Sequence, residues 1–153
     1  LFALLSHPDE LQRLRADSSL MPSAIWELLR WDSPVQLNVR AALRDVEILG
    51  ESVGYGQIYT VLQGSGNRDE AAYPVADGLD VGRFVDRSTP PPLSFGWGPH
   101  HCLGAALARA EGEIVFGGLL DRFASLELLE APSFRSSFTL RGLTSLNVAC
   151  RSR

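Results

Sequence analysis

The strongest constraint in this sequence is the stretch of residues 63–101, which shows almost no helical or strand periodicity. Prolines at positions 74, 90, 91, 92 and 99 and several glycines interrupt it. Compact domains seldom contain an irregular segment of this length unless it serves a function. The stretch leads directly to Cys102, and apolar residues then recur at three- and four-residue steps, at Leu103, Ala106, Leu107, Ala110, Ile114 and Leu119. We therefore expect a functional loop that leads into an amphipathic helix of about six turns, with Cys102 at the helix N-terminus.

Two short helices are predicted before this stretch. The first begins at residues 6–10, where Pro8 and two acidic residues favour a helical first turn. The second begins at Pro22 and carries an apolar stripe. It ends before Pro34, because a proline disfavours helical geometry at the residue that precedes it.

Short runs rich in Val, Ile, Tyr and Thr, broken by glycines, predict the strands. They lie at residues 35–62, 126–129 and 146–150, with a hairpin turning at Arg141-Gly142. No crossover helix interrupts the first run, so we expect antiparallel pairing there. The predicted fold class is mainly α with small antiparallel β-sheets (α+β).

Composition and charge narrow the classes of function. The chain has 153 residues, 45% of them hydrophobic, and a formal net charge of -4, which is typical of one soluble domain with no attraction for nucleic acid. No apolar run is long enough to span a membrane. The apolar start at Leu1, where no Met stands, leads us to expect that residues 1–153 form a single partial domain whose N-terminal part is missing. Two widely spaced cysteines indicate a reducing compartment, so a cytoplasmic protein is expected.

The segment 95–104 places Cys102 between a glycine-rich loop and a helix. Unpaired amides and the positive end of a helix dipole favour a thiolate there, and a thiolate is the form that binds metals. Gly96 and Gly98 allow a tight fold beneath the sulfur, and Gly104 leaves room for a flat cofactor. A thiolate held in this way can bind one axial position of a haem.

Three other interpretations of Cys102 were weighed. A structural cysteine would explain Cys150, in an apolar strand-like run, but not the residues crowded before Cys102. A zinc site built from His100, His101 and Cys102 needs adjacent side chains to converge, and only His7 and Cys150 remain to complete it. A cysteine-dependent phosphatase needs an arginine six residues after the cysteine, where this chain has Ala108 and Arg109 comes one position late.

These residues resemble a known family. Phe-Gly-x-Gly-x-His-x-Cys-x-Gly at residues 95–104 is similar to the haem-binding signature of the cytochrome P-450 monooxygenases. Glu27 and Arg30 resemble the family's Glu-x-x-Arg pair, and Arg83 resembles the arginine of the loop before the haem segment. The segments 66–69 and 107–109 resemble bacterial-type members. The resemblance implies the C-terminal haem-binding part of that fold, in which Glu27, Arg30 and Arg83 form a buried structural ion-pair network.

The resemblance also implies which residues hold the cofactor, haem b (iron protoporphyrin IX). Cys102 would be the iron ligand and the catalytic group, while Arg40 and His100 would bind the haem propionates. Phe95 would pack near the sulfur. The full set expected to bind the cofactor is Cys102, His100, Arg40, Phe95, Gly96, Leu103 and Gly104. Substrate contacts are expected from Leu37, Asn38, Val39 and Leu143.

The activity implied by the resemblance is insertion of one oxygen atom from O2 into a small apolar organic substrate. A ferredoxin-type or other redox partner would deliver two electrons singly. The family's oxygen-activating helix is expected upstream of Leu1, so the fragment alone should be inactive. The alternatives are a haem-binding or sensing protein without turnover and a cysteine-dependent phosphatase.

Overall fold

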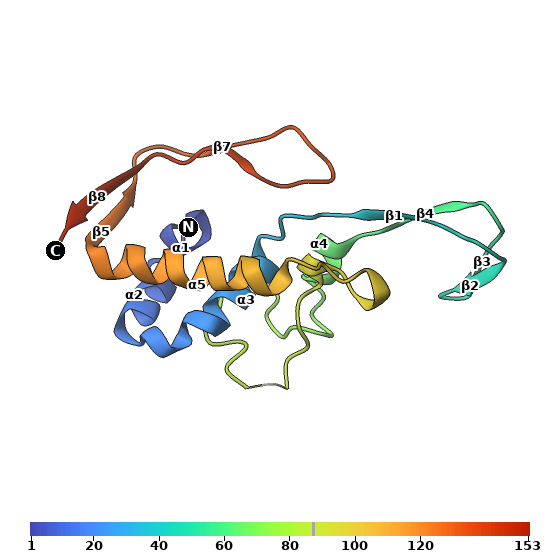
Figure 1. The fold of residues 1–153 in the computed structure, drawn as a ribbon, viewed down its shortest axis with the longest axis horizontal. Helices are drawn as coiled ribbons and strands as arrows, with labels where there is room; N and C mark the ends of the chain where they lie inside the picture. Colours follow the sequence, from blue (N-terminus) through green and yellow to red (C-terminus); the bar gives the residue numbers. More distant parts are fainter. Residues whose placement is uncertain (87) are drawn as a thin grey trace.

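The computed structural model describes residues 1–86 and 88–153, and its helices form the centre of the molecule (Figure 1). Proline stands in the first turn of both α2 and α3, where a missing N–H costs nothing. The helix α3 ends at Trp31, ahead of Pro34. The α-helices are α1 Phe2–Leu5, α2 Pro8–Ala16, α3 Met21–Trp31, α4 Gln63–Gly66 and α5 Ala105–Arg122. The short 3-10 helices are η1 Ser18–Leu20, η2 Leu93–Phe95 and η3 Gly98–His100.

The strands form four antiparallel two-stranded ribbons. The pairs are β1 Asn38–Ala41 with β4 Ile58–Val61, β2 Val46–Ile48 with β3 Glu51–Val53, β5 Phe123–Leu128 with β8 Val148–Ser152, and β6 Ser133–Phe134 with β7 Leu143–Ser145. The first two pairs extend from one end of the helical centre, and β5 and β8 lie at the other end (Figure 1). Helices with small antiparallel sheets are thus confirmed. A hairpin is present where one was expected, but Arg141 and Gly142 lie at the end of its connecting loop 135–142, which joins β6 to β7.

The core lies where α2, α3 and α5 meet, and it reaches β5 and the irregular stretch. Its members are apolar side chains that are almost completely buried: Leu4, Leu14, Met21, Ala24, Ile25, Leu79, Val81, Leu120 and Leu126. Leu79 and Val81 come from the stretch that lacks periodicity in the sequence. The irregular segment is therefore part of the packed core. It contains the short helices α4, η2 and η3.

Two expectations about α5 are corrected by the structure. The helix begins at Ala105, so Cys102 lies in the turn before it and not at its first residue. The face of α5 that carries Leu107 and Ile114 is exposed, as is Leu103 in the turn before the helix, whereas Leu120 is buried. Because α5 is apolar on more than one side, periodicity alone does not say which side packs against α3. Among the described residues, no helix combines the length and apolar character that a membrane span requires.

Candidate functional site

The loop that carries Cys102 is closed by backbone hydrogen bonds. The Cys102 N–H donates to the Phe95 carbonyl oxygen at 2.8 Å, and the His101 N–H donates to Gly98 at 3.0 Å. Gly96 and Gly98 have φ values of +73° and +78°, which a residue with a side chain rarely adopts. The sequence therefore folds back on itself between Phe95 and Cys102, and it presents the Cys102 side chain to solvent.

The surroundings of the sulfur suit an anion and a flat apolar group. In the described part of the chain, no oxygen accepts the amide N–H of Leu103 or Gly104. A side chain built on Gly104 would meet the Cys102 Sγ at 3.9 Å, so this glycine lies beside the sulfur. Leu103 is fully exposed next to it. Free amides beside a thiol stabilise the thiolate, and an exposed leucine offers an apolar surface.

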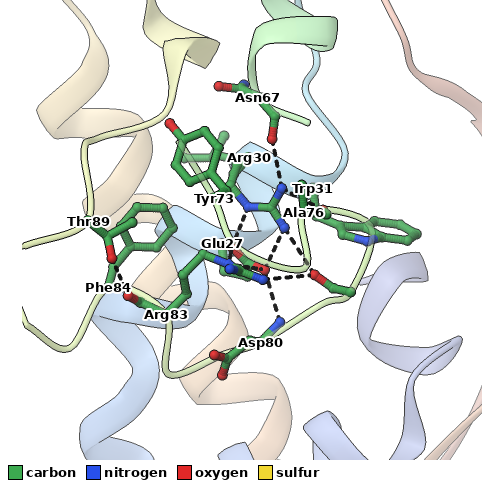
Figure 2. Close-up of polar contacts among 12 residues, drawn as sticks. Glu27, Arg30, Trp31, Asn67, Tyr73, Ala76, Asp80, Arg83, Phe84 and Thr89 are labelled. Atoms are coloured by element: carbon green, nitrogen blue, oxygen red, sulfur yellow. Dashed lines mark hydrogen bonds and ion pairs between the residues drawn. The ribbon is translucent and has the colours of Figure 1, made fainter. Parts of the chain in front are cut away.

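Glu27 and two arginines form a buried ion-pair network (Figure 2). The Arg30 Nε and Nη2 donate to the two Glu27 carboxylate oxygens at 2.7 and 2.8 Å. Both side chains have 0% exposure. The Arg83 Nε lies 3.1 Å from each of the same oxygens, and the Asp80 N–H donates to one of them at 2.9 Å. The structure thus brings Glu27, Arg30 and Arg83 together from α3 and the irregular stretch.

The arginines of this network also bind backbone carbonyls of the irregular stretch. Arg30 donates to Asn67 and Ala76 at 2.7 and 2.8 Å, and Arg83 donates to Pro74 at 2.7 Å. Carbonyl groups that lack secondary-structure partners are satisfied in this way. The network is therefore what gives a segment without periodicity a defined path.

Tyr73 completes the buried side of this network. Its ring lies 5.3 Å from the Arg30 guanidinium carbon, measured at the ring centroid, and its hydroxyl donates to Pro91 at 3.3 Å. Burial raises the pKa of the Tyr73 phenol above its ordinary value, and the positive charge of Arg30 partly opposes that rise. The phenol therefore stays neutral beside the ion pairs at physiological pH.

Asn67 is a structural residue that the sequence reasoning did not single out. Its side chain is completely buried and donates to the hydroxyls of Ser33 and Ser94 at 2.7 and 2.9 Å. Its amide oxygen accepts the Leu93 N–H at 2.7 Å. These bonds join the end of α3 to η2, which begins the cysteine loop. In the sequence, the only indication of Asn67 was its place in the Gly-Asn-Arg-Asp segment, for which no structural role was predicted.

The predicted haem-propionate partners lie on exposed positions. Arg40 lies on β1, paired with Tyr59, and among the described residues its side chain donates only to the Val39 carbonyl, at 2.9 Å. His100 ends η3 in the cysteine loop and is exposed. Neither forms an ion pair with any described residue. Both therefore keep polar atoms available to a ligand.

The predicted substrate contacts do not gather at one place. Leu37 and Asn38 are half-buried, Val39 is exposed, and the Asn38 amide donates to Gln63 at 2.7 Å. Leu143 instead lines an apolar cavity of about 340 Å³ between α1, α3 and α5, which residues 37–39 do not line. In this chain Asn38 thus has a partner of its own. Across the described residues, no group of three or more His, Cys, Asp or Glu side chains could hold a metal ion.

Sequence comparison places the chain among known proteins. A family model described as cytochrome P-450 matches residues 7–144. The chain is 41% identical over 151 residues to a protein described as cytochrome P-450 126 of Mycobacterium tuberculosis, covering 99% of this chain and 36% of that protein. It is 44% identical over 148 residues to cytochrome P-450 133B2 of Xylella fastidiosa, covering 95% and 36%. The chain thus spans only 36% of the length of these relatives.

Structure comparison agrees with this result. The cytochrome P-450 BioI, solved with an acyl carrier protein ligated to hexadec-9Z-enoic acid, has a TM-score of 0.92 and 38% identity, and the match covers 98% of this chain and 38% of that one. CYP109E1 of Bacillus megaterium, solved with testosterone, has a TM-score of 0.89 and 28% identity, covering 99% and 41%. Helices and ribbons of this chain therefore follow a known arrangement over nearly their whole length.

Proposed function

This chain belongs to the cytochrome P-450 family, and on that premise we propose that it is the C-terminal, haem-binding part of a haem-thiolate monooxygenase. Members of the family are haem-iron monooxygenases. The whole protein would insert one oxygen atom from O2 into an organic substrate. Because the chain spans 36% of its relatives' length, its own share of that task is to hold the cofactor.

The observation that carries this proposal is the exposed thiol of Cys102 at the end of a closed loop. Within the described residues, the amides of its neighbours Leu103 and Gly104 have no acceptor. Leu103 presents an exposed apolar side chain, and Gly104 has none. A thiolate with such neighbours would hold the iron of a haem, and it would supply electron density to that iron. Cys102 is therefore the proposed iron ligand.

Arg40 and His100 are the proposed partners of the haem propionates. Both are exposed and have no ion pair among the residues that the structure describes. A guanidinium binds a carboxylate through two parallel hydrogen bonds, and a histidine ring can donate one. The two side chains would orient the cofactor, while the loop holds the sulfur.

The bound haem would supply the binding and activation of O2. The chain's own residues would orient the haem, hold the thiolate and form part of the pocket wall, for which Leu37, Asn38, Val39 and Leu143 remain proposed. We propose a ferredoxin-type electron donor and a small apolar substrate. Two related structures were solved in complex with an acyl chain and with testosterone, and both of these molecules are largely apolar. Two free cysteines agree with a cytoplasmic protein.

One rival hypothesis is disfavoured by a specific contact. A cysteine-dependent phosphatase would need Arg109 free to bind phosphate. The Arg109 guanidinium carbon instead lies 4.3 Å from the centroid of the Trp26 ring. A haem-binding protein without turnover would keep every contact described for Cys102, so only assay of the full-length protein distinguishes it from the monooxygenase.

The deciding experiment is a carbon monoxide difference spectrum of the reduced, haem-containing full-length protein. We expect a strongly red-shifted Soret band that Cys102→Ser abolishes and the matched Cys150→Ser variant retains. Both cysteines are free and exposed, so the pair separates ligation from a general effect of losing a thiol. A protein that binds haem without this band would refute thiolate ligation. NAD(P)H-dependent hydroxylation with a ferredoxin and its reductase would then separate the monooxygenase from a haem sensor.

A further inference from the structure

Trp26 lies where three segments of the chain meet, and the proposed function gives it no role. Its indole packs edge-on against Phe95 of the cysteine loop, with ring centroids 6.2 Å apart and an interplanar angle of 74°. It also packs against Phe84 of the irregular stretch at 6.4 Å. From α5, Arg109 stacks over the indole at 4.3 Å. One side chain of α3 thus touches the loop, the irregular stretch and α5.

Arg109 is held by this ring and not by a carboxylate. Its Nε is buried without a hydrogen-bond partner among the described residues. It forms no ion pair with them either. A partly desolvated cation over an indole is attracted by the ring quadrupole more strongly than one exposed to water. The stacking on Trp26 is therefore the main attraction that fixes the Arg109 side chain, and it fixes the indole in turn.

Phe95 connects the indole to the cysteine. Its ring contacts Trp26, and its carbonyl oxygen accepts the Cys102 N–H at 2.8 Å. Gly96 and Gly98 contribute no side chains to the packing of the loop, and Trp97 is 69% exposed. A shift of the Phe95 ring would therefore move the backbone that carries Cys102.

We propose that Trp26 is a positioning residue for the iron ligand. Clamped by Arg109, it holds Phe95 and thereby the loop that presents Cys102. This inference rests on the proposed function, because it requires Cys102 to bind the haem iron. Groups around a metal ligand set its orientation and the reduction potential of the metal. Removal of the indole therefore makes the position of Cys102 less fixed without altering Cys102 itself.

The test compares Trp26→Leu with Trp31→Leu in the haem-containing full-length protein. Trp31 lies on the same helix and has its own stacked arginine, Arg68, at 4.6 Å, but it forms no aromatic pair with the described residues of the cysteine loop. We expect Trp26→Leu to shift the midpoint potential of the iron. The reduced carbon monoxide complex can form with or without the red-shifted Soret band. In this variant we expect the ratio of the form without the band to the form with it to rise about tenfold. Trp26→Phe should restore most of both values, and Trp31→Leu should change stability alone.

The outcomes separate the two proposals. A wild-type protein that binds haem without the red-shifted band would refute the function on which the inference rests. A wild-type protein with the band, together with an unchanged potential and band ratio in Trp26→Leu, would overturn the positioning role and leave the function intact. If Trp26→Leu does not fold, Arg109→Gln removes the clamp and keeps the indole. It should shift both readouts in the same direction, and unchanged values would overturn the proposal.

Discussion

Among single residues, Glu27 is the side chain whose loss should cost the most stability. It is fully buried and its carboxylate accepts hydrogen bonds from Arg30, Arg83 and the Asp80 amide. Glu27→Gln leaves two buried guanidinium groups without a neutralising charge, so we expect the free energy of unfolding to fall by about 3–5 kcal/mol. Equilibrium urea unfolding of the full-length protein, followed by circular dichroism, measures this change.

Asp77→Asn is the matched control for that variant. Asp77 also pairs with an arginine, Arg68, at 2.9 Å, but its side chain is 93% exposed. Water screens such a pair, and its loss should cost no more than about 1 kcal/mol. Equal losses in the two variants would show that burial of the Glu27 network contributes nothing beyond a surface ion pair.

The roles of some single residues could be predicted from the sequence and those of others could not, and the reason is physical. The spacing of Glu27 and Arg30 by itself indicates only a weak pair on one helix. Their resemblance to a family motif, with Arg83, is what suggested a network. The roles of Asn67 and Trp26 were not predicted, because the residues that they contact lie far from them in the sequence. Local sequence patterns contain no information about such distant contacts.

Among the elements, the helices α3 and α5 lie close together at Gly112. A side chain on Gly112 would meet the Ile25 Cδ1 at 3.2 Å and Cγ2 at 3.3 Å, and Ile25 belongs to the core. Alanine would gain about 1 kcal/mol of helix propensity but cost about 1–3 kcal/mol through overpacking. We expect Gly112→Ala to lower the free energy of unfolding by up to about 2 kcal/mol in urea unfolding, and the added Ile25→Val to recover part of the loss.

Gly117→Ala on the same helix provides the comparison. A side chain at Gly117 would meet nothing within 4 Å, and the residue borders a hollow beside Arg15. Only the propensity gain remains, so the free energy of unfolding should rise by about 0.5–1 kcal/mol. If both alanines stabilise the protein equally, the helices can separate at no cost and the packing argument is wrong.

The elements themselves were largely predictable, whereas their packing was not. Proline in the first turn located α2 and α3, and runs of β-branched residues located the segment that forms β1 to β4. For α5, periodicity predicted a long helix but not its buried side, since Leu107 is exposed and Leu120 is buried. Which side of an apolar helix packs depends on the surface opposite it, and that surface comes from other segments.

In the molecule as a whole, the exposed apolar face of α5 is the feature that a self-contained domain would not be expected to carry. Leu107 and Ile114 on this face are 64% and 75% exposed. Exposed apolar patches mark surfaces that another segment, a ligand or a partner covers. The chain spans 36% of its relatives' length, so the remaining length of the full protein is available to cover this face.

This interpretation predicts opposite effects for one substitution in two contexts. In the isolated chain of residues 1–153, Ile114→Glu should reduce binding of an apolar dye and increase solubility, because it places a charge on an exposed apolar face. In the full-length protein the same glutamate would be buried without a partner, so haem retention and the urea midpoint should fall. Glu113→Gln, one position along the helix on a half-buried site, is the control and should change neither protein in this manner. If Ile114→Glu leaves the full-length protein as stable as the wild type, Ile114 stays in contact with water in the complete fold, and the exposed face of α5 belongs to its surface.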